Sequence, residues 1–96
     1  ENNGNYSAAF KNLFDWCSRI DKNVFQEKPM LLMATSPGGR GGASVLEIAK
    51  NAFPRYGATV KETFSLPLFN ENFDTKKMEI SNPEFDAQLK EIVRNL

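Results

Sequence analysis

The sequence predicts an α/β fold built on a parallel sheet, and two observations support this prediction. Residues 30–34 form a continuously apolar run, Met-Leu-Leu-Met-Ala, which is typical of a strand covered on both faces. Residues 58–66 form a second strand-like run, and a segment of helical periodicity lies between the two runs. Strand, helix and strand in this order predict one right-handed βαβ unit with parallel strands.

The composition limits the classes of protein to be considered. A chain of 96 residues, 41% hydrophobic and 25% charged, is enough for one small globular domain. Its 12 basic and 12 acidic residues give a formal net charge of zero, which argues against a nucleic-acid or anionic-membrane partner. No apolar run approaches the ~20 residues of a membrane span, and we identify no signal peptide.

The chain contains no histidine, and Cys17 is its only cysteine. The commonest general base, the Ser-His-Asp arrangement and a zinc site are therefore excluded. A lone cysteine cannot form an internal disulfide, which is typical of a reducing compartment and predicts a cytoplasmic protein. If the protein is an enzyme, we expect its chemistry to lie on a bound cofactor.

The first half of the chain is expected to contain one helix and the buried strand. Apolar residues recur at helical spacing over residues 6–20, with polar residues on the opposite face. Cys17 lies on the apolar stripe, so we expect a buried, inert thiol. The strand begins after Pro29 and ends at Thr35, because Pro37 disfavours helical backbone at the residue before it.

Two more helices and one strand are expected in the second half. Residues 42–56 form a helix whose last turn Pro54 kinks and which ends at Gly57. The strand at residues 58–66 carries charges and suits a sheet edge. Residues 67–81 are expected to be irregular, and the last helix begins at Pro83 with Asn82 as its cap.

A glycine-rich loop joins the first strand to the helix that follows. Glycine lets a ligand approach the backbone closely, and a helix N-terminus presents unpaired N–H groups to anions. The loop is not a Walker A motif, and Gly39-Arg40-Gly41 is followed by Ser44 where a dinucleotide fingerprint needs its third glycine. Spacing alone leaves two alternatives, which are ligand contact and a simple turn from strand to helix.

The chain is expected to contain two strands and three helices, and two strands do not make a complete parallel sheet. The apolar strand needs a neighbour at each edge, and residues 58–66 supply only one. We therefore expect residues 1–96 to be one partial domain, the C-terminal part of a larger α/β domain. The alternative is that a second copy of the chain completes the sheet.

Three segments carry a resemblance to the NADPH-dependent FMN reductases, a flavodoxin-like family that includes quinone, chromate and azo-dye reductases. Residues 1–6 and 13–16 resemble the family's P-E-Y-N-G-S loop and L-K-N-A-x-D-W helix, with direct matches at Lys11-Asn12 and Asp15-Trp16. Residues 36–43 resemble its glycine-rich loop, and 66–73 resemble the segment after its fifth strand. The likeness extends over essentially the whole chain.

The resemblance implies a doubly wound parallel sheet with FMN at the carboxyl ends of its strands and NADPH as hydride donor. It implies nine cofactor-binding residues in two loops beside the flavin ring, where backbone amides of the loops would contact the ring: Glu1, Asn2, Asn3, Gly4, Asn5, Ser36, Pro37, Gly38 and Gly39. It implies no catalytic side chain, a small-molecule electron acceptor such as a quinone, and a homodimer or homotetramer in which residues 6–20 and 42–56 are interface elements.

The chain departs from the family pattern in two ways. Asn2 stands where the family has a ring-stacking tyrosine, and Ser7 stands where it has a proline. The N-terminal half of the family's domain, which carries the loop that binds the FMN phosphate, is absent from these residues. We therefore expect the parent protein to be the reductase and residues 1–96 alone to be inactive.

Three functions compete at this point. The first is an FMN-dependent NAD(P)H oxidoreductase that passes hydride from nicotinamide to FMN and electrons to an acceptor. The second is a non-catalytic flavodoxin-like module that pairs with a partner through its open strand edge. The third is a nucleotide- or phosphate-binding protein that uses only residues 38–42. Flavin binding separates the first function from the other two.

Overall fold

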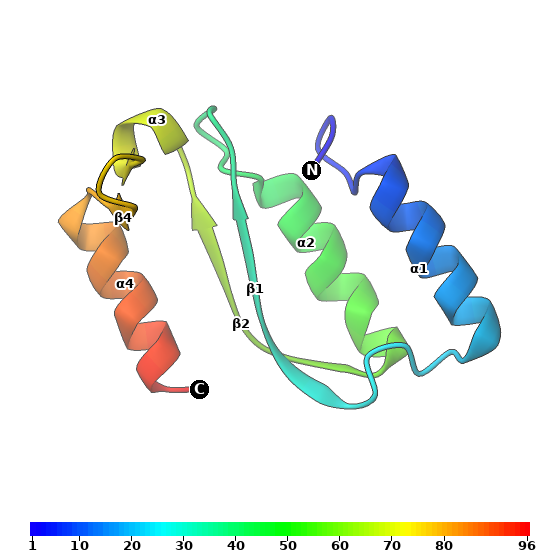
Figure 1. The fold of residues 1–96 in the computed structure, drawn as a ribbon. Coiled ribbons are helices and arrows are strands. Elements are labelled where there is room, and N and C mark those ends of the chain that lie inside the picture. The colour runs from blue at the N-terminus through cyan, green and yellow to red at the C-terminus, as the bar shows by residue number, and fades with distance from the viewer.

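A computed structural model describes all residues 1–96, which form two short sheets and the helices around them. The elements in chain order are α1 (Ala8–Ile20), β1 (Lys28–Thr35), α2 (Ala43–Ala52), the 3-10 helix η1 (Phe53–Tyr56), β2 (Ala58–Leu66), α3 (Phe69–Asn72), β3 (Phe73–Asp74), β4 (Glu79–Ile80) and α4 (Pro83–Arg94). Helices α1 and α2 lie on one side of β1 and β2, and α4 lies on the other (Figure 1).

β1 and β2 are parallel, which confirms the predicted βαβ unit. Met30 pairs with Val60 but Leu31 pairs with Glu62, so Lys61 is an extra residue in β2. Such a bulge changes the phase of a strand by one residue. It explains why the apolar alternation of β2 is interrupted near Glu62.

The core lies between α1, α2 and the strands and is built around aromatic rings. The ring of Phe53 lies 4.6 Å from that of Phe25 and 6.1 Å from those of Tyr6 and Phe10, measured between centroids. Ala49, Phe53 and Ala58 are buried together, and Met30 and Leu32 of β1 pack against them. Packing of these rings fixes α1 against the end of α2.

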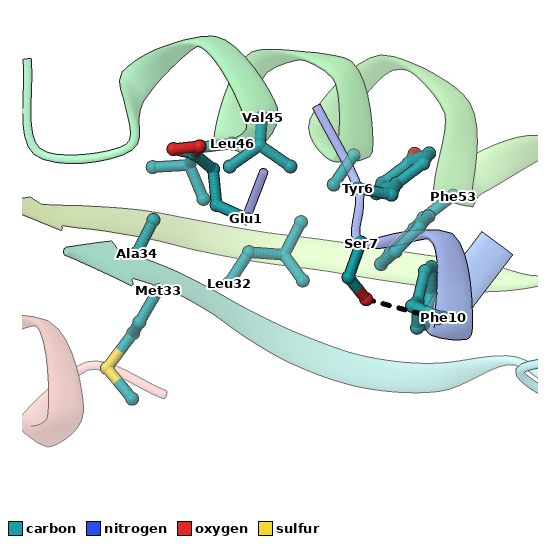
Figure 2. Close-up of a pocket in the computed structure, with 11 residues that line it drawn as sticks. Glu1, Tyr6, Ser7, Phe10, Leu32, Met33, Ala34, Val45, Leu46 and Phe53 are labelled. Atoms are coloured by element: carbon teal, nitrogen blue, oxygen red, sulfur yellow. Dashed lines mark hydrogen bonds between the residues drawn. The ribbon is translucent and has the colours of Figure 1, made fainter. Parts of the chain in front are cut away.

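β1 is less buried than its apolar sequence predicts. The exposed fraction of Met33 is 60%, and no residue of β1 is fully buried. The reason is that Met33 lies on the face of β1 away from α2, and α4, on that side of the sheet, packs mainly against β2 and β4 (Figure 2). Within residues 1–96, the expectation of a strand covered on both faces is wrong.

The element ends follow from capping residues, with small corrections to the predicted bounds. Ser7 accepts a hydrogen bond from the amide of Phe10, so α1 begins at Ala8 and not at residue 6. The segment containing Pro54 is a 3-10 helix, and Gly57 ends it with φ of 86°. Asn82 caps α4 as predicted. Residue Cys17 is half-buried and not buried as expected.

The segment at 67–81 is more regular than the sequence predicts. It contains α3 and the antiparallel pair β3–β4. Asn72 is buried; its side-chain amide donates to the carbonyl of Pro67 at 2.8 Å and its oxygen accepts from Asn82 at 3.0 Å. Such side-chain hydrogen bonds cannot be read from periodicity, and the expectation of an irregular segment is wrong.

Removing the Phe53 ring should destabilise the fold strongly. Phe53→Ala deletes the ring that four other aromatic residues contact, and such changes cost about 3–5 kcal/mol. We expect a large fall in the urea midpoint of unfolding followed by circular dichroism. Met78→Ala, at a side chain that is 74% exposed, is the control and should move the midpoint little. Equal effects of the two changes would contradict this description of the core.

Stability should also fall at high pH through Tyr6. Burial raises the pKa of the Tyr6 phenol above its ordinary value. Tyr6 therefore loses its proton at a lower pH in the unfolded chain than in the folded protein. For this reason Tyr6 does not affect the free energy of unfolding below about pH 10 and lowers it as pH rises above that value. Tyr6→Phe should remove this part of the pH dependence, as measured by urea unfolding at pH 8 to 11. If the variant keeps the same pH dependence of unfolding, groups other than Tyr6 cause that dependence.

Candidate functional site

Three loops meet at one end of the molecule, beyond the carboxyl end of β1. They are the N-terminal loop of residues 1–5, the glycine-rich loop of residues 36–42 and the segment from Pro67 to α3 (Figure 1). In open α/β sheets, ligands bind at the carboxyl ends of the strands. The loops named in the sequence prediction therefore lie together at this end of the molecule.

The N-terminal loop is an ordered tight turn and not a frayed terminus. The amide of Asn2 donates to the carbonyl of Asn5 and the amide of Asn5 donates to that of Asn2, both at 3.0 Å. Asn3 and Gly4 take the left-handed backbone of such a turn, with φ of 53° and 77°. The Glu1 carboxylate accepts from the Gly4 amide at 3.0 Å and closes the loop from the other side.

The glycine-rich loop is held by the segment that follows β2. The amides of Leu68 and Phe69 donate to the carbonyls of Gly38 and Ser36 at 2.9 and 3.0 Å. The Ser65 hydroxyl donates to the Gly41 carbonyl at 2.9 Å. These bonds use the carbonyl groups of the loop and fix its path.

The four glycines of this loop divide into two pairs with different roles. Gly41 and Gly42 are buried, have positive φ, and would place a Cβ 2.5 Å from the Ser65 hydroxyl and 2.8 Å from the Ala34 methyl. No side chain fits there, so this pair is required for packing. A Cβ on Gly38 or Gly39 would meet nothing within 4 Å. Packing does not require glycine at these two positions, so access to the backbone is the remaining physical reason for it.

The same stretch offers free backbone donors. The N–H groups of Gly38, Gly39 and Arg40 donate to no acceptor of the chain, while the neighbouring carbonyls are bonded. All three residues are exposed, so their amides are available to a ligand. An open backbone with unbonded N–H groups is suited to carbonyl oxygens and to ring nitrogens that carry negative charge.

A polar cavity of about 340 Å³ lies between the N-terminal and glycine-rich loops. Its lining consists of Glu1, Gly4, Ser36, Gly38, Gly39, Arg40, Gly42, Ala43 and Ser44. Five of the nine predicted site residues are thus brought together. The other four, Asn2, Asn3, Asn5 and Pro37, lie in the same loops but do not line the cavity.

Arg40 and Ser44 line the cavity although the sequence reasoning did not single them out. The Arg40 guanidinium donates to the Ser44 hydroxyl at 2.7 Å across the first turn of α2. Arg40 is the only cation in the lining and Glu1 is the only carboxylate. The signal in the sequence that pointed to Arg40 was its position between the two glycine pairs.

An apolar cavity of about 320 Å³ adjoins the polar one, and Glu1 lines both. It lies between α1, α2 and β1, with Tyr6 and Phe10 on one side and Leu32 and Val45 on the others (Figure 2). No titratable side chain except Glu1 and Tyr6 reaches it. No group of three or more potential metal-binding side chains occurs in the chain.

These features define an α/β domain with a backbone-lined cavity at the carboxyl end of a parallel sheet. A model of the family described as NADPH-dependent FMN reductase matches residues 1–72, and the chain belongs to this family. Its cofactors are FMN and NADPH, and its fold is a partial flavodoxin-like one. The match includes both loops and ends at α3. No curated protein matches the chain in sequence, and none of its helices is long and apolar enough to cross a membrane.

The two glycine pairs should respond differently to alanine. Gly41→Ala forces a Cβ against the backbone of Leu66 and Pro67 at positive φ, so we expect a loss of about 2 kcal/mol or more of stability. Gly39→Ala should change stability by less than about 0.5 kcal/mol. Urea unfolding of the two variants measures the difference. Comparable losses would place both glycines in the packed part of the loop.

Proposed function

We propose that residues 1–96 form the ring-side part of an FMN-dependent NAD(P)H oxidoreductase of the quinone reductase type. The observation that supports this best is the open backbone of Gly38 and Gly39, whose amides are unbonded at the mouth of the polar cavity. The family match supplies the cofactor class. The proposed ring-contacting residues remain residues 1–5 and 36–39.

The residues present suit the flavin ring better than its phosphate. Backbone N–H groups of residues 38–40 can donate to ring carbonyls and nitrogens, and Glu1 and Gly4 close the opposite wall. The cavity lining contains Arg40 as its only cation, and that guanidinium already donates to Ser44. A phosphate monoester usually receives several charge-assisted bonds. We therefore place only the ring against this chain.

When bound, FMN supplies the redox chemistry by taking hydride from NADPH and passing electrons to an acceptor. The chain contributes orientation and electrostatics, because it has no histidine and its cavity has no nucleophile paired with a base. Amides aimed at the ring stabilise negative charge on the reduced cofactor without a proton transfer from the protein. We propose a quinone or similar small molecule as the acceptor.

We also propose that the complete protein is a cytoplasmic homodimer or homotetramer. The lone cysteine supports a reducing compartment. Trp16 on α1 has an exposed fraction of 67%, and a large exposed aromatic side chain is typical of a subunit contact. Light scattering, which measures the mass of the assembly in solution, tests this proposal when the protein is compared with its Trp16→Ser variant.

Flavin titration tests the site directly. We expect the chain to quench the fluorescence of FMN and of riboflavin with similar dissociation constants, since the ring is the shared group. Gly39→Val should weaken both at least tenfold and leave the urea midpoint unchanged, because its Cβ meets no protein atom within 4 Å. Gly57→Ala, in a turn outside the polar cavity, serves as a variant that can lose stability without changing flavin contact.

Three results would contradict the proposal. They are no quenching of either flavin by the chain, equal flavin affinity of Gly39→Val and the parent chain, and displacement of FMN by inorganic phosphate. Displacement by phosphate with no riboflavin binding would favour a phosphate-binding protein that uses residues 38–42. NADPH oxidation by the flavin-loaded protein, with a quinone as acceptor, then tests the activity.

A further inference from the structure

Asn72 is the only buried polar residue of the chain, with an exposed fraction of 8%. Its side-chain amide donates to the Pro67 carbonyl at 2.8 Å, and its side-chain oxygen accepts from the Asn82 amide at 3.0 Å. A buried amide costs free energy unless it is paired, so these two bonds hold the Asn72 side chain in one orientation.

The Pro67 carbonyl belongs to the same peptide unit as the Leu68 amide. The chain has no cis peptide bond, so the C=O and N–H groups of this planar unit point in opposite directions. The carbonyl accepts from Asn72 on one side, and the amide donates to the Gly38 carbonyl at 2.9 Å on the other. Asn72 therefore fixes the peptide plane whose N–H group holds the glycine-rich loop.

The same relation holds inside the glycine-rich loop. The Gly38 carbonyl and the Gly39 amide share one trans peptide, so the bond from Leu68 turns the Gly39 N–H group away from the segment that follows β2. This N–H group donates to no acceptor of the chain, and Gly39 lines the polar cavity. A continuous series of hydrogen bonds, whose members polarise one another, thus runs from the buried amide to a free donor.

The backbone at Leu68 explains why the bond from Asn72 is needed. Leu68 has φ of 48° and ψ of 59°, a left-handed conformation that is unfavourable for a residue with a side chain. A flip of the Pro67–Leu68 peptide would return this φ to negative values and would withdraw the Leu68 amide from Gly38. The bond from Asn72 opposes the flip, because the flipped carbonyl would point away from the buried amide.

We propose that Asn72 is a positioning residue of the flavin-ring site, because its side chain holds the Pro67–Leu68 peptide in the orientation that presents the Gly39 N–H group to the ligand. The identity of the ligand rests on the proposed function. Asn72 does not contact the ligand, and it acts through the two peptide units of Leu68 and Gly39.

The residues that orient Asn72 lie outside the family match, which ends at Asn72 itself. Its side-chain oxygen accepts from Asn82, and its backbone carbonyl accepts from the Ser81 amide at 2.9 Å. Asn82 is also the cap of α4. The start of α4 therefore supports the glycine-rich loop through Asn72.

Amide hydrogen exchange followed by NMR without flavin tests the hold on the peptide. Asn72→Ala removes the donor, so we expect the Leu68 amide to exchange at least tenfold faster than in the parent chain. Asn70→Ala, at an exposed position of the same short helix, is the matched control and should leave this rate unchanged. The Phe25 amide, which is bonded outside this network, is the internal reference. An unchanged rate at Leu68, or equal acceleration at Leu68 and Phe25, would overturn the proposal.

Riboflavin binding tests the link to the site, under conditions in which every variant is folded. Asn72→Ala should raise the dissociation constant at least fivefold, whereas Asn70→Ala and Gly57→Ala, which lie outside the polar cavity, should keep the parent value. Donors aimed at the ring favour its reduced, negatively charged form, so the midpoint potential of riboflavin bound to Asn72→Ala should be more negative than in the parent chain. A loss of stability alone would not produce this shift.

The two measurements separate this proposal from the proposed function. Failure of the parent chain to bind riboflavin would contradict the proposed function, and the exchange rate of Leu68 would still decide whether Asn72 holds the peptide. Faster exchange at Leu68 together with an unchanged riboflavin affinity and potential would overturn the positioning role of Asn72 while the proposed function stands.

Discussion

The parallel pairing of β1 with β2 determines where every part of the site lies. Its register sets Thr35 level with Leu66, and the Thr35 hydroxyl donates to the Leu66 carbonyl at 2.7 Å. The loops that follow the two strands therefore begin at the same level along the sheet. The segment after β2 can then reach the carbonyl groups of Ser36 and Gly38, which holds the glycine-rich loop open. A slip of one residue would move these donors away from their acceptors and reverse the faces of the strand.

Within that frame, a single loop combines two opposite requirements. Gly41 and Gly42 are packed so closely that a methyl group has no room, whereas a methyl group on Gly38 or Gly39 would meet no atom within 4 Å. The tight pair holds the loop against β1 and β2, and the open pair presents its amides to the cavity. Rigid support beside an accessible backbone is what preorganised donors need, because they then lose little freedom when a ligand binds.

Much of this arrangement follows from the sequence, because helical spacing, the apolar run 30–34 and the caps at Gly57 and Asn82 are local signals. Glu1 and Gly39, which were named from the family motifs, also line one cavity. The β-bulge at Lys61 and the bonds of Asn72 depend on contacts between distant segments, which no local pattern contains. The exposure of β1 was missed because an apolar run indicates a preference for burial and does not identify the neighbours that provide it.

Glu1 lines both the polar and the apolar cavity. Its carboxylate also accepts a hydrogen bond from the Gly4 amide, which holds the N-terminal loop in its turn. Ordering that loop in advance would lower the entropy lost when a ring binds against it.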